Sequence, residues 1–397
     1  KKLEAENIKT FAQGDAKIDK DTNFVVVSTA IEPSVPEYKQ ALELNIPIIH
    51  RSEMLKKITE SKKTIAVSGT SGKSSTTAMI FTILDECGFS PSMLNGSGLV
   101  SLQKKGEIGN AAVGKGDWLV IEADESDGSL VNYSPEIGLI LNIERDHKEL
   151  DELEKIFAQF SSQVKDNLIV NTENEHSKIF SNNSAFDFAS ETSNFFPKNI
   201  KQFNNKIEFE LKNTKFSISI IGLHNVENAT ATIAVCNYLG ISVKDIAKAF
   251  KKYKGIDRRM QILGVRNDVT FIDDYAHNPV KIENAIKSAQ DLGERVLAFF
   301  QPHGFAPMFF IKDEFIERIK ETFRSNDEIY LPPIFYAGGT ANKTISSQEI
   351  VDELKSKGVN AFVSSPRENF AKQIKNKLKP QDIVLIMGAR DPSLDGR

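Results

Sequence analysis

The stretch SGTSGKSSTT, from Ser68 to Thr77, combines glycine, lysine and hydroxyl residues in a spacing that suits a phosphate ligand. The apolar run TIAVS precedes it and a helical pattern follows, which is the strand–loop–helix context that a phosphate site requires. The start of such a helix offers free N–H groups and the positive end of the helix dipole. Lys73 can then reach the terminal phosphates of a nucleotide, and the Ser74 hydroxyl can bind Mg²⁺. A glycine-rich turn with a serine helix cap is the alternative interpretation.

The loop departs from the strict pattern G-x-x-x-x-G-K-[ST], because Val67 stands where that pattern has its first glycine. Gly69 and Gly72 still allow the backbone to approach a phosphate closely. The candidate ATP-binding residues of the loop are Gly69, Thr70, Ser71, Gly72, Lys73, Ser74 and Ser75.

Two polar clusters follow strand-like runs further along. The segment VIEADESDGS (120–129) carries four carboxylates, which are Glu122, Asp124, Glu125 and Asp127. Ligands of open α/β sheets bind at the carboxyl ends of the strands, and Mg²⁺ needs only one or two protein carboxylates beside phosphate oxygens. Glu122 is therefore the candidate metal ligand, although such a cluster is also typical of a solvated loop. His147, in LNIERDH (141–147), ends the next run in the same way and is a second candidate, with a purely structural histidine as the alternative.

The second half of the chain carries further clusters of this kind. His224, Asn225 and Asn228 stand at the start of a predicted helix, where asparagine is also a good cap. The run DRRMQ (257–261) supplies two arginines, Arg258 and Arg259, either of which could bind phosphate through its guanidinium fork. The runs FIDDYAHNP (271–279) and FFQPHGF (299–305) add Asp273, Asp274, His277 and His303 near the ends of strands.

Short apolar runs alternate with helical patterns through most of the chain, which predicts an α/β fold with parallel strands and crossover helices. The segment 186–221 is different, because FDFAS, KIEFELK and KFSISI alternate apolar and polar residues with period two. This pattern predicts an antiparallel extension of the sheet. We expect an N-terminal piece at 1–60, a central domain at 61–256 and a C-terminal α/β domain at 257–397.

The composition excludes several other classes of protein. With 397 residues, 40% hydrophobic and 26% charged, and a net charge of -4, the chain has no basic excess that would indicate nucleic acid or a membrane surface. No apolar run is long enough for a membrane helix. The two cysteines, Cys87 and Cys236, are far apart in sequence, which favours a reduced, cytoplasmic compartment without a disulfide. Because the chain begins KKLEAEN without Met, we expect that its N-terminal domain is truncated.

Taken in order, GTSGKSSTT, EADESDGS, NIERDH, GLHNVENA, RRMQ, DDYAHNP and FQPH resemble the motifs of the Mur ligases, over nearly the whole chain. These enzymes use ATP to add amino acids to the UDP-N-acetylmuramate peptide stem of peptidoglycan, and the shortened loop GTSGKS is the form found in that family. The motifs look most like those of members that add L-alanine, or of the related members that recycle a murein peptide. The resemblance implies three domains: a UDP-muramate-binding domain, a central ATPase sheet and a Rossmann-like C-terminal domain.

The resemblance also implies roles for single residues. Lys73 and Ser74 would hold the ATP phosphates and one Mg²⁺, while Glu122 and His147 would organise metal and reactants. His224, Asn225 and Asn228 match positions on the adenine side. Arg259 would touch the terminal phosphate and Asp274 the ribose side. His277 and His303 would lie near the incoming amino acid.

The chain departs from the alanine-adding members at two motifs, and one of them is DDYAHHP, which reads DDYAHNP here, with Asn278. Those enzymes usually read PHRYSRT where this chain reads PHGFAPM, so that Gly304 and Pro307 replace two arginines. L-alanine addition remains the leading expectation, with small-molecule substrates and a monomer or homodimer. The alternatives are addition of a tripeptide, a folylpolyglutamate-type ligase, and a nucleotide-binding sensor without turnover.

Overall fold

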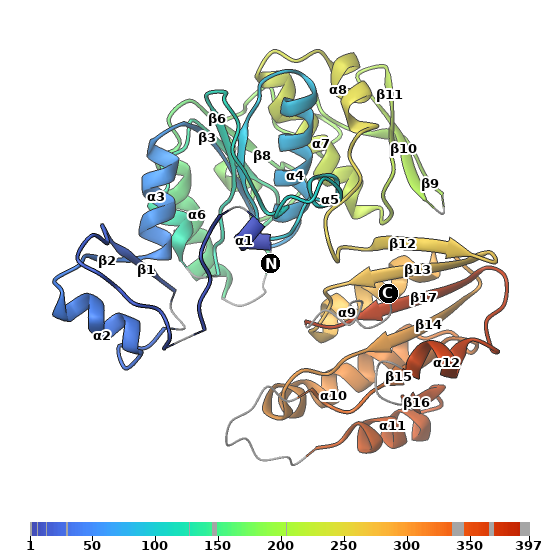
Figure 1. Cartoon of the computed structure of the whole chain (residues 1–397). Helices are drawn as coiled ribbons and strands as arrows, with labels where there is room; N and C mark the ends of the chain where they lie inside the picture. Colours follow the sequence, from blue (N-terminus) through green and yellow to red (C-terminus); the bar gives the residue numbers. More distant parts are fainter. Residues whose placement is uncertain are drawn as a thin grey trace. The chain divides into compact units, whose positions relative to one another are not determined.

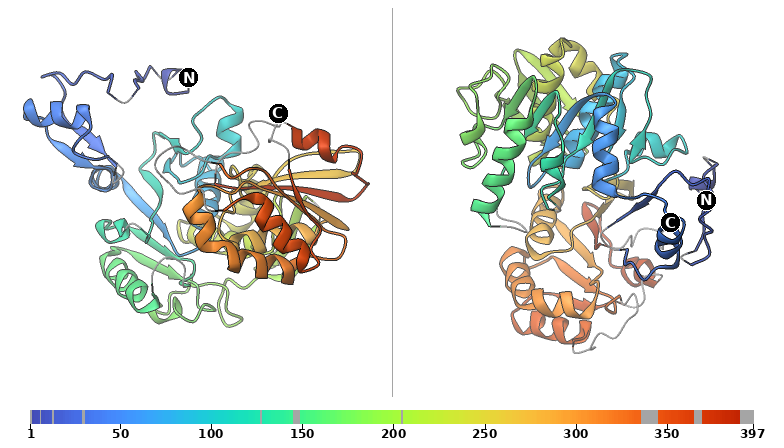
Figure 2. Two further views of the ribbon diagram at one scale, coloured as in Figure 1. Left: turned by 90° about the horizontal axis from the view of Figure 1, so that it is seen from below. Right: turned by 90° about the vertical axis from the view of Figure 1, so that its left-hand side faces the viewer.

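The computed structural model describes residues 2–5, 7–12, 14–28, 31–126, 128–144, 149–203, 205–335, 345–364 and 369–389. The chain divides into two compact units (Figures 1 and 2). The first unit comprises Lys1–Asn199, Phe209–Phe216 and Val226–Lys254, and the second comprises Ile200–Glu208, Ser217–Asn225 and Gly255–Arg397. Within the described residues, no helix combines the length and the apolar character that crossing a membrane would need.

The first unit is built on a six-stranded sheet with the order β5-β4-β6-β3-β7-β8 (Figure 1). Its strands are β3 (Lys63–Ser68), β4 (Ser92–Leu94), β5 (Ala111–Ala112), β6 (Trp118–Glu122), β7 (Ile137–Ile140) and β8 (Asn167–Val170). Neighbouring strands are parallel, except that β5 runs antiparallel to β4. From β3 the chain first builds the β4 side of the sheet and later the β7 side. The carboxyl end of β3 is therefore a topological switch point, where ligands of such sheets bind.

The helices of the first unit are α4 (Lys73–Glu86), α5 (Val100–Lys104), α6 (Leu150–Gln163), most of α7 (His224–Tyr238) and α8 (Val243–Phe250), with short 3-10 helices η1 (Ser129–Asn132) and η2 (Lys178–Phe180). Helix α4 is buried along most of its length, from Thr76 to Leu84. A helix that is buried on all sides is held by packing rather than by an amphipathic stripe. The loop at its N-terminus is thus anchored at one end by β3 and at the other by a helix in the core.

The N-terminal part of the first unit contains a small parallel sheet of two strands. Its elements are α1 (Lys2–Ala5), β1 (Val25–Val27), α2 (Pro36–Glu43), β2 (Ile48–His50) and α3 (Arg51–Glu60).

The segment 186–221 differs from the prediction in two respects. Strands β9 (Lys198–Phe203), β10 (Lys206–Leu211) and β11 (Thr214–Ile218) form a separate sheet with the order β11-β10-β9, so they do not extend the central sheet as we expected. The run FDFAS is not a strand, since Phe188 makes only isolated bridges to Asn171 and Phe195. A period-two pattern predicts strands, but it does not say which sheet they join.

The second unit contains another six-stranded sheet, with the order β12-β13-β17-β14-β15-β16. Its strands are β12 (Gln261–Arg266), β13 (Val269–Asp274), β14 (Arg295–Phe300), β15 (Glu328–Leu331), β16 (Ala361–Val363) and β17 (Asp382–Met387). Only β12, at the edge, is antiparallel to its neighbour. The helices are α9 (Pro279–Gln290), α10 (Phe305–Thr322), α11 (Ser347–Ser356) and α12 (Phe370–Ile374).

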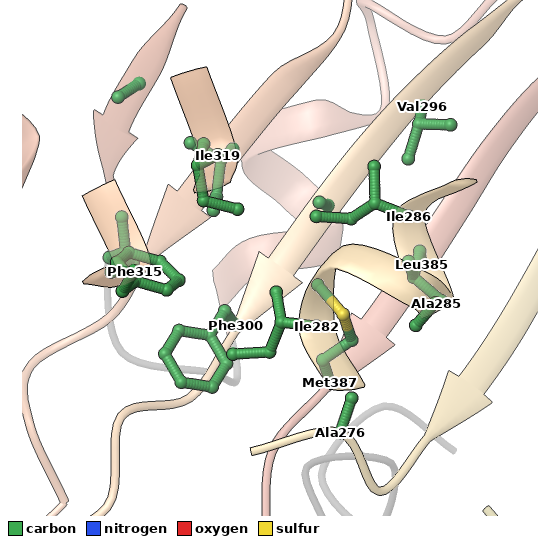
Figure 3. Packing of buried hydrophobic residues seen from close by; sticks show 14 of the residues in the cluster. Ala276, Ile282, Ala285, Ile286, Val296, Phe300, Phe315, Ile319, Leu385 and Met387 are labelled. Carbon is green, nitrogen blue, oxygen red and sulfur yellow. The ribbon is translucent and has the colours of Figure 1, made fainter. Parts of the chain in front are cut away.

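Alternate residues of β14 serve the two faces of this sheet. Val296, Ala298 and Phe300 belong to a core cluster with residues of α9, α10 and α11, whereas Leu297 and Phe299 pack with α12. Figure 3 shows Ile282 of α9 beside Phe300 and Met387 in the first of these clusters. Helices on both faces of a mostly parallel sheet give the α/β architecture that the alternating pattern predicted.

Candidate active site

The loop after β3 has the backbone geometry of a phosphate cradle. Gly69 and Gly72 have φ angles of +136° and +84°, and Gly72 caps the N-terminus of α4. A side chain at Gly69 would lie 3.0 Å from the Cβ of Leu141, and one at Gly72 would collide with the amide of Asn228. Both positions therefore require glycine, because backbone angle and space each exclude a side chain.

Lys73 lies at the centre of this loop. Its Nζ donates to Glu125 Oε2 at 2.8 Å and to the Gly69 carbonyl at 2.8 Å, and it lies 3.6 Å from Asp124 Oδ1. Burial raises the pKa of the Glu125 carboxyl, and Lys73 only partly offsets that effect. For Asp124 burial acts in the same direction, but Lys73 and Ser126 prevail and lower its pKa. The ammonium thus lies between two acids from the loop after β6.

Ser74 is joined to the carboxyl end of β6. Its Oγ donates to Glu122 Oε2 at 2.7 Å, and the same oxygen accepts from the Gly96 N–H at 2.8 Å. A side chain at Gly96 would lie 2.7 Å from that oxygen, so the position leaves room only for the carboxylate. The Asn95 amide nitrogen donates to the Ser74 carbonyl, while its buried Oδ1 has no hydrogen-bond partner among the residues that the structure describes.

These oxygens fit a magnesium ion that also binds nucleotide phosphate. Among the described residues, no three His, Cys, Asp or Glu side chains are arranged to hold a metal by themselves. Mg²⁺ does not need such a group, because it keeps waters and takes one or two carboxylates together with phosphate oxygens. The hydroxyl of Ser74, the carboxylate of Glu122 and the unpaired oxygen of Asn95 are all hard ligands of the kind that it prefers.

A second set of contacts ties the loop to the end of β7. Asn142 Oδ1 accepts from the Ser71 N–H at 2.9 Å and lies 3.0 Å from Thr70 Oγ1, and its Nδ2 donates to the Ser71 carbonyl. Behind it, Glu227 of α7 accepts from Asn171 Nδ2 at 2.9 Å, and Asn142 also donates to Glu227. This network fixes the loop from the side opposite Glu122.

In the second unit, charged residues gather at the carboxyl end of β13. Arg258 donates from Nε to Asp273 Oδ1 at 3.4 Å and also binds the carbonyls of Gly388 and Ala389. The Asp274 carboxylate accepts from the Met260 N–H at 2.7 Å and the Ala276 N–H at 2.8 Å. Burial raises the Asp274 pKa. Both aspartates are therefore engaged in holding this end of the sheet together.

Family models of known proteins match segments of both units of the chain. The "Mur ligase family, catalytic domain" model matches residues 1–63, the "Mur ligase middle domain" model 67–236, and the "Mur ligase, glutamate ligase domain" model 258–390. A UDP-N-acetylmuramate–L-alanine ligase of Carboxydothermus hydrogenoformans is 33% identical over 98% of this chain and 86% of its own length. The chain belongs to the Mur ligase family.

Other Mur ligases give the same picture. A UDP-N-acetylmuramate–L-alanine ligase of Rhizobium etli is 32% identical over 98% of this chain and 86% of its own length. The crystal structure of the UDP-N-acetylmuramate–alanine ligase MurC from Thermotoga maritima matches with a TM-score of 0.82 and 25% identity, and covers all of this chain and 88% of that one. A murein peptide ligase from Psychrobacter arcticus, at 21% identity and a TM-score of 0.61, shares the fold.

For this Mur ligase, the structure brings together several of the predicted site residues. The Ser74 hydroxyl donates to Glu122 at the end of β6, and the adjacent Lys73 donates to Glu125 in the loop that follows. Asn228 packs against Gly72. Ser75 is in the first turn of α4. His147 lies outside the described residues.

The remaining predicted residues belong to the second unit. Arg259 is exposed, stacks over Tyr275 at 5.8 Å and forms no ion pair among the described residues, unlike Arg258. Asn225 is buried and donates to the Ile221 carbonyl, whereas His224 is exposed at the start of α7. His277 packs edge-on against Tyr275, and the exposed His303 stacks on Phe335. These contacts leave the proposed ligand roles of these residues as predictions.

Sequence reasoning missed Asn95 and Asn142, which bind the loop from two sides. A signal for Asn142 was available, because it lies within LNIERDH at the carboxyl end of a predicted strand. Asn95 gave no such signal, since β4 has only three residues and its approach to Ser74 depends on the tertiary fold.

Proposed function

We propose that this chain is an ATP-dependent amide ligase that joins L-alanine to the carboxylate of UDP-N-acetylmuramate in peptidoglycan synthesis. The observation that carries this proposal is the set Lys73, Ser74 and Glu122 at the switch point of the central sheet, in a chain of the Mur ligase family. Its relatives named as L-alanine ligases support the choice of substrate.

The chemistry explains these residue types. A carboxylate is a poor acylating agent, so ATP first converts it to an acyl phosphate, which the amine of the amino acid then attacks with loss of phosphate. Phosphoryl transfer depends mostly on positioning and on neutralising charge. We assign the first task to the loop N–H groups and the second to Lys73 and Arg259. When bound by Ser74, Glu122 and His147, Mg²⁺ would supply further positive charge at the phosphates.

We also propose the predicted roles on the nucleotide and amino-acid sides. His224, Asn225 and Asn228 would line the adenine side, Asp274 the ribose side, and His277 and His303 the amino-acid side. The three family matches support boundaries near 60 and 256 for three domains. We expect the enzyme to act in the cytoplasm on small molecules, as a monomer or homodimer, without nucleic acid or a membrane; its two cysteines are free thiols.

One observation favours a second candidate function, the addition of a tripeptide. The arginines expected after His303 are replaced by Gly304 and Pro307, and the exposed side chains of Phe309 and Phe310 follow in α10. An arginine fork is the usual way to fix a carboxylate. Without it, a larger acceptor could bind through its body instead.

Phosphate release from ATP tests these alternatives directly. We expect release that requires both UDP-N-acetylmuramate and L-alanine. Parallel reactions with L-serine, glycine and an L-Ala–D-Glu–diamino-acid tripeptide test the acceptor. Release with the tripeptide alone would replace the first proposal by the second, and ATP binding without any release would indicate a sensor.

A further inference from the structure

The Lys73 ammonium is already occupied by an acid of the same protein. Its Nζ lies 2.8 Å from Glu125 Oε2, and both side chains are buried, with 11% and 5% of their surface exposed. Asp124, which also faces the ammonium at 3.6 Å, is 44% exposed. The close and buried partner of Lys73 is thus Glu125.

A nucleotide phosphate must compete for this ammonium. An ammonium has three donors, and the Gly69 carbonyl and Glu125 each take one. A phosphate oxygen brought to Lys73 would also add negative charge next to a buried carboxylate. Repulsion between like charges is strong where water is largely excluded.

We propose that Glu125 is an internal competitor of ATP, which holds Lys73 in the free protein and must give it up when a phosphate binds. This inference rests on the proposed nucleotide site. It makes Glu125 a positioning residue that lowers nucleotide affinity, separate from the metal-binding role proposed for Glu122.

The surroundings of Glu125 suit such an exchange. Glu125 lies in a turn after β6. The Gly128 N–H donates to the Glu125 carbonyl and closes this turn, so the backbone position of Glu125 is defined. A largely buried ammonium without a partner would be costly, so the pair with Glu125 holds Lys73 in place before the nucleotide arrives. Burial also favours the protonated carboxyl once Lys73 has turned to the phosphate.

The test is calorimetric titration of the full chain with a non-hydrolysable ATP analogue and Mg²⁺. Glu125→Gln keeps the size of the side chain and removes its charge, so we expect the analogue to bind about five- to tenfold more tightly. Glu125→Ala, which removes the carboxylate altogether, should also bind it more tightly than the wild type. Asp124→Asn is the matched control, and because Asp124 is more distant and exposed, its effect should stay below about twofold. Adenosine, which lacks phosphates, should bind all of these proteins equally.

Each outcome of the titration supports or overturns the role of Glu125 or the nucleotide site itself. Binding of the analogue to folded Glu125→Gln with equal or lower affinity than to the wild type would overturn the proposal and make Glu125 a support for Lys73. An equal gain for adenosine would also overturn it, since competition for a phosphate could not explain that gain. If neither wild type nor variants bind the analogue, the nucleotide site itself is wrong. If only the effect of Glu125 is absent, the nucleotide site stands.

Discussion

Two regions of this Mur ligase place acids at the carboxyl end of a parallel strand, yet they use them differently. At the end of β6, Glu122 and Glu125 bind the side chains of Ser74 and Lys73, where the glycine loop enters α4. At the end of β13, Asp274 binds backbone N–H groups and Asp273 binds the guanidinium of Arg258, which also holds carbonyls after β17.

The difference lies in what the acids hold. A bond to a lysine or serine side chain can be exchanged for a ligand, because the side chain can turn without moving the fold. A bond to backbone N–H groups or to a buried guanidinium cannot be given up without loosening the sheet. We infer that the first region is where chemistry occurs, and that much of the charge in the second supports the architecture and leaves Arg259 free for a ligand.

The largest expected effect is on Lys73. Lys73→Ala removes the positive charge that we assign to the ATP phosphates, so turnover should fall by about a hundredfold or more. Phosphate release measures it, and a thermal melt checks the fold. Lys63→Ala is the control, since Lys63 is an exposed lysine at the start of β3, the strand that leads into the glycine loop. Near-normal turnover in folded Lys73→Ala would contradict the inference that chemistry occurs at the end of β6 rather than at the end of β13.

A pair of neighbouring arginines tests the second region. Arg258→Ala would remove the guanidinium that faces the buried Asp273 carboxylate, and we expect a loss of about 3 kcal/mol in the free energy of unfolding. Arg259→Ala should change that free energy by less than about 0.5 kcal/mol, because its side chain is exposed. Chemical denaturation measures both. Among folded proteins, Arg259→Ala should lose more turnover than Arg258→Ala. Normal turnover in Arg259→Ala would count against the role of Arg259 at the phosphate.

A change at Glu122 should have a smaller effect, on the magnesium concentration that the enzyme needs. Glu122→Gln keeps the volume but removes the charge, so half-maximal activity should need about tenfold more Mg²⁺. A magnesium titration of turnover measures the shift. Glu86→Gln, at the exposed far end of α4, is the control. An unchanged magnesium requirement for Glu122→Gln would return the acid cluster to the status of a solvated loop.

The smallest effect concerns the pH dependence of stability at Glu227. Burial raises its pKa above the ordinary value of 4.5, so the folded state favours the protonated carboxyl. Its contribution is therefore present below the ordinary pKa and is lost as pH rises through the raised pKa. We expect the wild-type melting temperature, relative to Glu227→Gln, to fall by about one to two degrees between pH 4 and pH 8. A difference that is constant with pH would contradict the raised pKa.

Much of the fold could be predicted from sequence periodicity. The runs at 64–68, 117–124 and 137–143 correspond to β3, β6 and β7, and the helix predicted at 73–87 is α4. The edge strand β12 was not predicted, because residues 261–266 include Gly264 and lie mostly exposed. We also predicted wrongly that the strands β9, β10 and β11 extend the central sheet, because pairing between strands depends on contacts distant in sequence.

The residues of the candidate site likewise divide into those that the sequence could indicate and those that it could not. Lys73, Ser74 and Glu122 could be found from sequence, because a glycine loop and strand ends are local features with a fixed position in an α/β sheet. Their partners could not. The pairing of Lys73 with Glu125, and the approach of Asn95 and Asn142 to the loop, join segments between 21 and 72 residues apart.

The sequence by itself determined the class of fold, the position of the glycine loop between a strand and a helix, and the membership of the Mur ligase family, because each depends on residue types at short spacing. Only the tertiary structure decided which charges are held by side chains that can exchange and which by the backbone. Arg258 and Arg259 are adjacent and identical in type, and both lie over the ring of Tyr275, yet Arg258 is half-buried and pairs with Asp273 whereas Arg259 is exposed. Local sequence cannot separate them, because burial and partners are set by the packing of distant strands.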